Sequence, residues 1–259
     1  MSTSIAVEMT NIEKRRLAPE EAEQLAEQVR AYMLEQAQEK VGRSLFMQRL
    51  EAGQLSRAEL QNFWLNWHSQ VWEINNLISV GYHLFTPFFK RNLDLLPLFA
   101  DKVADELTYP EPPGHLLIVW KQGEIFGLTR EQMVDHPVMP ECRALMEWHR
   151  GLLFEGTMFE YWTAMLYEEY SGHWSRASSR ALMKHYGYTR EQVPYFKVHE
   201  EADLHEHEGV MAHGKFNWLV YRRMLEQGEA RLRPSFSIQY CIDIELDLRQ
   251  RFLDACVEK

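Results

Sequence analysis

The sequence predicts an all-α fold, a single compact bundle of seven to eight helices. Apolar residues recur at three- and four-residue spacing almost throughout, and the alternating runs typical of strands are scarce. Capping boxes at Ser56, Thr129 and Thr189 mark helix starts. The chain has short loops, no repeats and no low-complexity linker. We therefore expect an N-terminal tail at residues 1–15 and one helical domain over residues 16–259.

Caps and helix breakers predict the elements in order. The first helix should begin at Pro19, a favoured first-turn residue, and run toward Leu50, with Gly53 beyond its end. Ser56 then caps a second long helix. A third stretch, at about 87–107, must stop before the segment TYPEPPGH, whose prolines each lack a backbone N–H. The remaining helices should begin near 115, 140, 157, 189 and 236, and the last three should end near 185, 227 and 257.

Composition excludes several classes of protein. The 259 residues carry a formal net charge of −10, so the chain is a poor candidate for binding nucleic-acid phosphates. The three cysteines form no C-x-x-C pair, which argues against a disulfide framework and for a reducing, cytoplasmic location. No run of about 18 uncharged apolar residues is present, so we expect no membrane span. The N-terminus has no apolar core typical of a signal peptide.

The segment YFKVHEEADLHEHEGVMAHG is the part of the chain richest in metal-ligand residue types. In an α-helix Asp203 would lie about 40° and Glu206 about 20° from His199, with His207 about 80° away and His205 about 120° away. Nitrogen and oxygen donors on one helix face can converge on one ion. A solvated acidic face with incidental histidines is the alternative. The full row reads Phe196, His199, Asp203, Glu206, Val210 and His213.

Two further segments place carboxylates beside apolar positions. Glu168 continues an apolar row at helical spacing, and a buried carboxylate is costly unless it is paired, protonated or bound to a metal. Its neighbour Glu169 should face solvent, and Glu168 itself would be a margin residue if the helix were rolled by one residue. In DELTYPEPPGH, Asp105, Glu106 and Glu111 precede His115, although some of these carboxylates are expected only to cap a broken helix. The apolar row consists of Phe154, Met158, Tyr161 and Met165.

Three strings resemble a known superfamily: the pair Tyr167-Glu168, KHYGY at 184–188, and YFKVHEEAD at 195–203. They are similar to the TenA/PqqC-like, haem-oxygenase-like superfamily, and most similar to its di-iron oxidase branch. That branch has a Glu and a His, a later Glu after an aromatic residue, and His-x3-Asp-x2-His. This chain has Glu206 where the motif ends in His, so either Glu206 or His207 would take that role. The implied metal ligands are Glu106, His115, Glu168, His199, Asp203, and Glu206 or His207.

The resemblance implies a non-haem iron-dependent oxidase, possibly with two irons, that acts with O2 on a small organic substrate. The substrate would be amino-acid-like, fatty-acid-like or aromatic, and the protein would be a homodimer without nucleic-acid or membrane partners. A PqqC-like cofactor-free oxidase and a metal-free TenA-like binding or regulatory protein are the alternatives. A thiaminase of the TenA type is disfavoured because no cysteine stands at a matching position. Haem cleavage is disfavoured because no histidine precedes His68.

Overall fold

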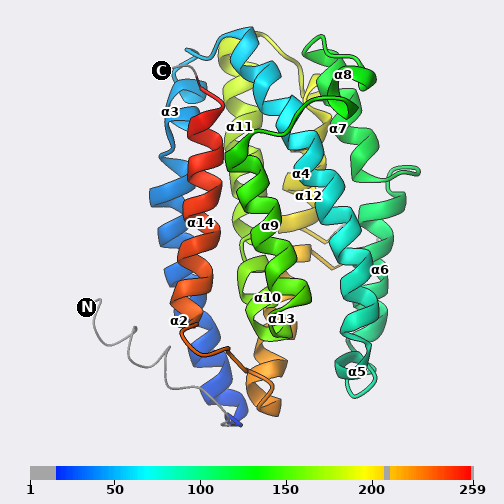
Figure 1. Cartoon of the computed structure of the whole chain (residues 1–259), viewed down its shortest axis with the longest axis vertical. Coiled ribbons are helices and arrows are strands. Elements are labelled where there is room, and N and C mark those ends of the chain that lie inside the picture. Colours follow the sequence, from blue (N-terminus) through cyan, green and yellow to red (C-terminus); the bar gives the residue numbers. More distant parts are fainter. Residues whose placement is uncertain (1–15, 207–210, 258–259) are drawn as a thin grey trace.

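Long helices lie side by side in the computed structural model, which describes residues 16–206 and 211–257 (Figure 1). No strand is present in these residues, so the predicted all-α fold is confirmed. The predicted tail at residues 1–15 lies outside the described residues. The elements are α2 (Pro19–Ala37), the π-helix η1 (Gln38–Gly42), α3 (Leu45–Glu51), α4 (Arg57–Leu84), α5 (Thr86–Phe89), α6 (Leu96–Thr108), α7 (His115–Ile125), α8 (Arg130–Val134), α9 (Pro140–Phe154), α10 (Met158–Met165), α11 (Glu168–Tyr186), the 3-10 helix η2 (Arg190–Gln192), α12 (Pro194–Leu204), α13 (His213–Gln227) and α14 (Ile238–Ala255).

Four of the predicted helices are divided, so the described residues form more helices than the seven or eight expected. The first stops at η1, and Ser44 then caps α3 by accepting a hydrogen bond from the Met47 amide. The stretch at 87–107 becomes α5 and α6, and the stretch at 157–185 becomes α10 and α11. The Thr189 box opens only the short η2, because Pro194 starts a new helix, α12.

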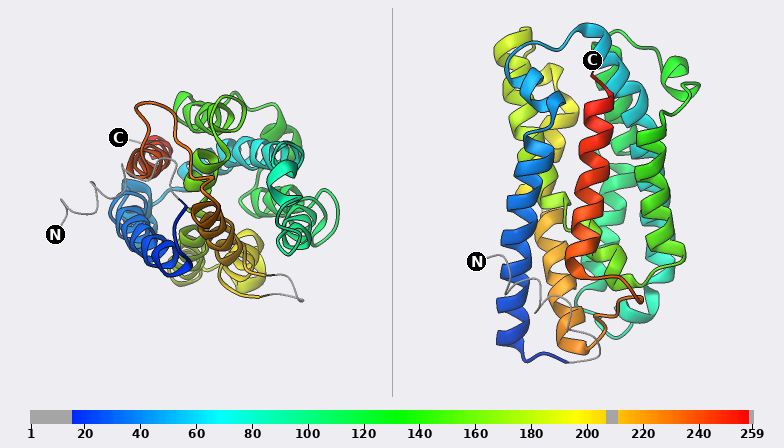
Figure 2. Two further views of the ribbon diagram at one scale, coloured as in Figure 1. Left: turned by 90° about the horizontal axis from the view of Figure 1, so that it is seen from below. Right: turned by 60° about the vertical axis from the view of Figure 1, so that its left-hand side comes forward.

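The bundle closes by packing distant parts of the chain together. The C-terminal helix α14 lies against α2 and α9, as the two views of Figure 2 show, and α13 packs against α2. Buried apolar side chains from α2 through α14 form one core. Stacked rings of Phe63, Trp67 and Phe252 join α4 to α14, with the Trp67 and Phe252 centroids 5.9 Å apart. The core therefore holds both ends of the described chain in one bundle.

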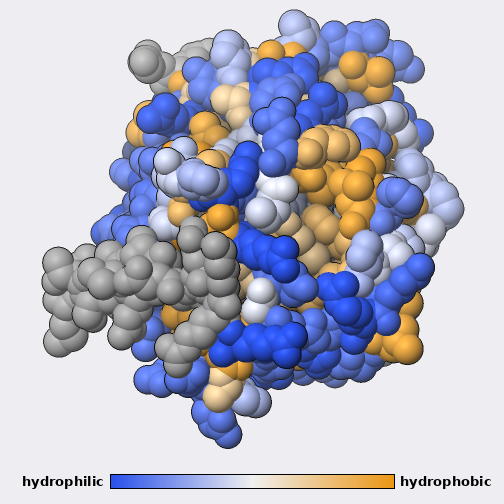
Figure 3. Space-filling model, turned by 60° about the horizontal axis from the view of Figure 1, so that its bottom comes forward, coloured by the Kyte–Doolittle hydropathy of each residue, from blue (hydrophilic) through white to orange (hydrophobic). Residues whose placement is uncertain are grey.

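The outer surface is largely hydrophilic on the face that Figure 3 brings forward, where apolar side chains gather in one area. Among the described helices, none combines the length and the apolar character that a membrane crossing would require.

Candidate metal centre

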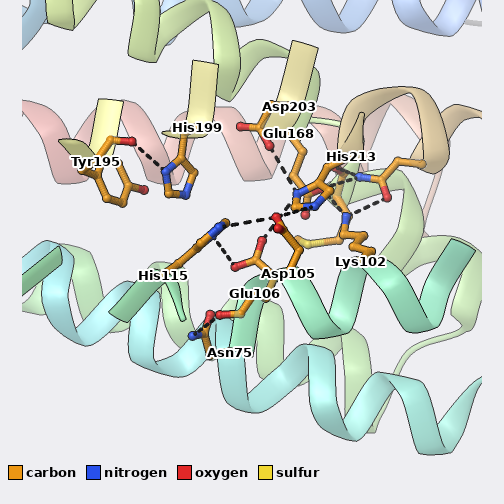
Figure 4. Close-up of polar contacts among 12 residues, drawn as sticks. Asn75, Lys102, Asp105, Glu106, His115, Glu168, Tyr195, His199, Asp203 and His213 are labelled. Carbon is orange, nitrogen blue, oxygen red and sulfur yellow. Dashed lines mark hydrogen bonds and ion pairs between the residues drawn. The ribbon is translucent and has the colours of Figure 1, made fainter. Parts of the chain in front are cut away.

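Six ionisable side chains from α6, α7, α12 and α13 meet inside the bundle, and we name them the acid–histidine cluster (Figure 4). Two come from the end of α6, one from the start of α7, two from α12 and one from the start of α13. Buried ionisable groups are rare in proteins unless they are paired or bind a metal. The members are Asp105, Glu106, His115, His199, Asp203 and His213, and all but the partly buried Asp105 are at most 9% exposed.

Tight turns and close helix contacts bring these segments together. The turn between α6 and α7 requires Gly114, which has a φ of +70°, and a Cβ there would lie 2.1 Å from the Glu106 carbonyl oxygen. The chain thus folds back so that His115 faces Glu106. On α11, a Cβ at Gly172 would lie 3.0 Å from the Asp203 Cβ and closer still to Leu204. Glycine at this position therefore lets α12 approach α11 closely enough to set Asp203 in the core.

The donor atoms of the cluster lie within a few ångströms of one another. His115 Nδ1 is 2.9 Å from a Glu106 carboxylate oxygen, and His115 Nε2 is 3.5 Å from Asp105. His213 Nε2 is 3.2 Å from the same Asp105 oxygen, and its Nδ1 is 3.5 Å from Asp203 and 3.6 Å from Glu106. Side chains from four helices, α6, α7, α12 and α13, thus surround one small volume.

These contacts are close but are not hydrogen bonds in their geometry. Both ring nitrogens of His115, both of His213, and Asp203 Oδ2 are buried without a hydrogen-bond partner among the described residues. Buried polar atoms without partners are rare in native proteins, and an unrepresented ion is one of the standard explanations. Glu168, Asp203 and His213 also offer ligand atoms that all lie within 4.8 Å of one another. Carboxylate and imidazole together suit iron, zinc or manganese.

His199 has the arrangement of a metal-binding imidazole. Its Nδ1 lies 2.9 Å from the carbonyl oxygen of Tyr195, one turn earlier on α12, and the two rings stack at 4.0 Å. An Nδ1–H donated to a backbone carbonyl fixes the tautomer and leaves the Nε2 lone pair for a ligand. Burial and the neighbouring His115 lower the pKa of His199 to about 3. The ring is therefore neutral at physiological pH, as a ligand must be.

At Glu106, His115 and His213, attraction to neighbouring groups of opposite charge shifts the pKa more than burial does. Burial tends to raise the pKa of Glu106, but His115 and His213 lower it to about 2. Burial tends to lower the pKa of His115, but Glu106 and Asp105 outweigh it and raise that pKa to about 10. Burial is likewise outweighed at His213, where Asp105 and Asp203 raise the pKa to about 9. The neighbouring carboxylates thus favour the protonated form of both imidazoles, and a metal ion that binds there would replace these protons.

The two aspartates differ in their electrostatic balance. At Asp105 burial is outweighed by the neighbouring His115 and His213, which hold its pKa well below the usual range. At Asp203 burial dominates, and the contact with His213 offsets it only in part, so its pKa rises to about 6. Of the two aspartates, Asp203 has the environment that disfavours the ionised carboxylate more strongly. A cation bound beside it would stabilise the ionised form.

Glu168 already has partners. The Lys102 ammonium forms a short ion pair with it, and the Asn217 amide donates to the same carboxylate oxygen at 2.9 Å. Lys102 is 4% exposed and also donates to the Asn217 side-chain oxygen at 3.0 Å. Lys102 lies one turn before Asp105 and Glu106 on α6, so its positive charge stands beside the cluster.

The structure brings five of the seven residues proposed from the sequence to this region: Glu106, His115, Glu168, His199 and Asp203. Glu206 lies outside it, because its side chain is 65% exposed and pairs with Lys215 at 3.0 Å. The expectation that Glu206 continues the helical row is wrong, since α12 ends at Leu204 and His205 is extended. Helical angles do not apply beyond that point. His207 lies outside the described residues.

His213 and Asp105 are the members that the predicted ligand set omits. His213 stands in the sequence row, but it reaches the cluster as the first residue of a separate helix, not along a continuous one. Asp105 is adjacent to Glu106, and both contact histidines. A signal for it was present in the paired carboxylates that precede His115. The expected solvation of Glu169 is also wrong, because it is buried between Arg30 and Trp218.

The cysteines take no part in this centre. Cys142, Cys241 and Cys256 are all buried. Burial raises the pKa of the Cys142 thiol to about 12, and it raises the pKa of the other two thiols as well. A thiol that stays protonated is a poor nucleophile.

A pocket adjoins the cluster, with an empty volume of about 600 Å³ that includes solvent at its mouth. Glu106, Glu168, His199 and Asp203 line one part of it, and apolar side chains form most of its wall. A partly apolar pocket beside convergent polar groups is the usual form of a small-molecule site.

Residues 100–232 match the model of a family described as iron-containing redox enzyme, and the match covers about half of the chain. The chain belongs to this family. All six residues of the acid–histidine cluster fall inside the matched region. No curated protein matches the chain.

The fold is also similar to that of a solved structure, a TenA homologue from Pseudomonas syringae pv. tomato strain DC3000. The two chains are 15% identical, 89% of this chain and 91% of that chain are covered, and the TM-score is 0.63. At this identity the likeness concerns the fold alone. The predicted membership of the TenA/PqqC-like, haem-oxygenase-like superfamily is confirmed.

Proposed function

We propose that this protein is a non-haem iron-dependent oxidase that acts with O2 on a small organic substrate bound beside the acid–histidine cluster. The observation that carries the proposal is the set of buried nitrogen and oxygen atoms of His115, His213 and Asp203, which converge without hydrogen-bond partners of their own. The family description, iron-containing redox enzyme, supports iron as the metal. The proposal also includes a cytoplasmic homodimer built from one domain at residues 16–259, as the resemblance implies.

In this proposal the cluster residues bind the metal, and their neighbours position the ligands and the substrate. His115, His199 and His213 would supply neutral imidazole nitrogen, and Glu106, Asp105 and Asp203 would supply carboxylate oxygen. Bound iron would supply the redox chemistry that activates O2 and leaves the substrate oxidised. Tyr195 fixes the His199 ring through its carbonyl, and the apolar part of the pocket wall would contact the substrate. The ligand set contains these six residues.

Glu168 would complete the centre only after a change of partner. In the structure its carboxylate is held by Lys102 and Asn217. A first metal could bind to the six cluster residues with this pair intact. A second metal would need the Lys102 ammonium to move away, because two cations cannot share one carboxylate edge at low cost. The proposal therefore assigns the tighter site to the cluster and the weaker one to Glu168.

The same Glu168 contacts favour a second candidate, a metal-free binding protein of the TenA type. A Glu whose Oε2 already pairs with Lys102 and Asn217 has a partner for its charge without a metal. In that protein the buried histidines would be charged partners for the carboxylates, and the pocket would bind a ligand without oxidising it.

Oxygen uptake separates the two candidates. The protein is loaded anaerobically with Fe(II), desalted and exposed to air in an oxygen electrode and in a spectrophotometer. The oxidase should consume O2 and develop an absorption band, whereas a sample loaded with Zn(II), which has no redox chemistry, should do neither. Absence of both O2 uptake and absorption change in the iron sample would contradict the proposed function and favour the binding protein.

A further inference from the structure

The acid–histidine cluster borders a second hollow besides the pocket described above. Glu106, His199 and Asp203 line that pocket, in which we place the substrate. Asp105 and His213 instead line a smaller hollow, with an empty volume of about 300 Å³ that includes solvent at its mouth. The two spaces share no lining residue among those that the structure describes. The cluster can therefore be reached from a second direction, and we name this second space the outer hollow.

The outer hollow leads from the surface to a buried imidazole. At its mouth the Glu201 side chain is 35% exposed, and His205, just beyond the end of α12, is exposed. Farther in, the Asp105 side chain is 12% exposed and that of His213 only 1%. Both ring nitrogens of His213 lack a hydrogen-bond partner within the described chain. A group that enters this hollow from solvent thus meets two members of the cluster, one of them with unused nitrogen atoms.

Carboxylate and imidazole groups form most of the polar wall of the outer hollow. Carboxylate oxygen and imidazole nitrogen are the donors that divalent iron, manganese and zinc bind. No lysine or arginine of the described residues lines this hollow. By contrast, Arg249 lines the substrate pocket, and three cationic side chains line a larger groove that borders Asp203. The three cationic side chains of the groove are Arg30, Lys215 and Arg222.

Glu201 keeps most of its capacity to attract an ion. Its ion pair with Arg190 is long, at 3.9 Å, and such a partly exposed pair is weak. Arg190 instead bonds the neighbouring Glu200 at 3.0 Å, and Arg176 bonds the same carboxylate at 2.8 Å. His205 lies 3.2 Å from another nitrogen of Arg176, so one of its ring nitrogens is already engaged. Glu201 is therefore the group at the mouth best placed to hold a cation for a short time.

The size of the outer hollow suits a hydrated ion. A water molecule takes up about 30 Å³ in the liquid, so a shell of six waters takes up about 180 Å³. This is less than the empty volume of about 300 Å³ in the outer hollow. The substrate pocket is the larger of the two, at about 600 Å³, and most of its wall is apolar.

We propose that the outer hollow is the route by which a divalent cation reaches the acid–histidine cluster. Glu201 attracts the hydrated ion at the mouth, and Asp105 and His213 then replace some of its waters. The inference rests on the metal centre of the proposed function, and it assigns metal and substrate to different entrances. The metal can then be exchanged while the substrate pocket is filled.

Loading rates test the role of Glu201. Full-length protein is freed of metal with a chelator and mixed with Co(II) by stopped flow, since the visible absorption of Co(II) changes as protein ligands replace water. Glu201→Lys should slow loading by roughly tenfold at low ionic strength, and added salt should reduce the difference, because charge attraction steers the ion. Glu206→Lys makes the same change of charge beside the larger groove and should load at the wild-type rate. Equal rates in all three proteins, or equal slowing by both variants, would overturn the inference.

A substitution without charge tests the route itself. Ala202 lines the outer hollow, so Ala202→Phe should narrow it. Loading and chelator-driven release should slow by the same factor, so that the affinity for Co(II) stays as in the wild type, whereas loss of a ligand would speed release. The matched control is Ala144→Phe, in a surface hollow between α9 and α14 whose described lining includes no cluster residue. Wild-type loading by folded Ala202→Phe would overturn the inference, and if the ring prevents folding, the Glu201→Lys comparison decides.

Metal content and O2 uptake distinguish failure of this inference from failure of the proposed function. A wild type that takes up neither Co(II) nor Fe(II) would refute the metal centre and, with it, both proposals. A wild type that loads Fe(II) through a route sensitive to Glu201→Lys but consumes no O2 would refute the oxidase and leave the entrance standing. A wild type that consumes O2, with loading rates that neither variant changes, would refute the entrance alone.

Discussion

Two of the buried groups of ionisable residues in this bundle are built differently. In the acid–histidine cluster, His115, His213 and Asp203 have buried atoms without hydrogen-bond partners. In the second group, Glu245 is bonded to His149 at 2.8 Å and to Arg249 at 2.6 Å, so both carboxylate oxygens are satisfied. We call this second group the Glu245 network.

The difference separates a binding site from a structural ion pair. The Glu245 network satisfies its carboxylate within the chain, so that carboxylate needs no added ion. In the cluster, Asp203 and His213 lie close enough to Glu168 for the three to share an ion, since their ligand atoms are within 4.8 Å of one another, and His115, His213 and Asp203 keep buried atoms without hydrogen-bond partners among the described residues. Buried charges of both kinds perturb pKa values, so the pKa values alone would not have told the two groups apart.

The largest expected contrast is between two buried histidines. His213→Ala should weaken Fe(II) binding by more than the roughly 10- to 100-fold that loss of an outer-sphere partner costs. His149→Ala should leave Fe(II) affinity unchanged, because its polar contacts within the described residues are with Glu245 and Gln70 and none is with the cluster. Anaerobic competition with a chromophoric chelator measures both. Equal losses of Fe(II) affinity in the two variants would contradict the distinction between the cluster and the Glu245 network.

The second contrast concerns stability. Arg249→Met should cost about 3–5 kcal/mol in the free energy of unfolding, because it leaves Glu245 as a buried charge without its cation. Adding Glu245→Gln should recover most of this loss. In the cluster, by contrast, Asp203→Asn should leave the metal-free protein at least as stable as the wild type, because burial already disfavours that charge. Urea denaturation of metal-free samples measures the free energy of unfolding of all three variants. A large loss of stability in Asp203→Asn would contradict the contrast.

The third contrast is a pH dependence. Burial tends to raise the pKa of Glu245, but His149 and Arg249 outweigh it and lower that pKa to about 2. A carboxyl with a lowered pKa stabilises the fold above its unfolded-state pKa, which is about 4.3, and this contribution is lost as the pH falls toward 2. Metal-free wild type should therefore lose stability between pH 5 and 3 more steeply than the Glu245→Gln, Arg249→Met double variant, by up to about 1.4 kcal/mol per pH unit. Parallel curves from denaturation at stepped pH would contradict this.

The smallest expected effect belongs to Lys102. Lys102→Met removes a buried cation beside the cluster, so Fe(II) affinity should rise by roughly tenfold as repulsion disappears and Glu168 becomes available. Lys215→Met is the control, since that exposed lysine pairs with Glu206 at the surface. Isothermal titration gives affinity and stoichiometry together. Loss of metal from Lys102→Met would mean that the lysine supports the site and does not compete with it.

Helix periodicity predicted the fold well because burial of an apolar face dominates helix packing. It also placed His199 and Asp203 on one face of a helix, and both are buried on α12. The same arithmetic failed at Glu206, because a helix end depends on the backbone conformation at His205, which periodicity does not encode. His213 reaches the cluster across that break, through packing of α13 that is not local in sequence.

Other features of the site could not be predicted from the sequence, because they depend on ion pairs between segments that are distant along the chain. The match of Lys102 to Glu168 joins α6 to α11, and that of Glu169 to Arg30 joins α11 to α2. Neither pair is close in sequence, so spacing rules give no signal for them. Arg249 lies so far along the chain that only the closed bundle shows that it borders the same pocket as His199.

The iron content of three proteins tests the central claim, that the acid–histidine cluster is a metal centre. Wild type, His199→Ala and His205→Ala are incubated anaerobically with Fe(II), desalted and measured by elemental analysis. His199 lies in the cluster, whereas His205 contacts Arg176 near the surface at the end of α12. The wild type and His205→Ala should retain at least one iron per chain, and His199→Ala should retain almost none. A wild type that retains no iron, or a His199→Ala variant that retains as much as the wild type, would contradict the claim.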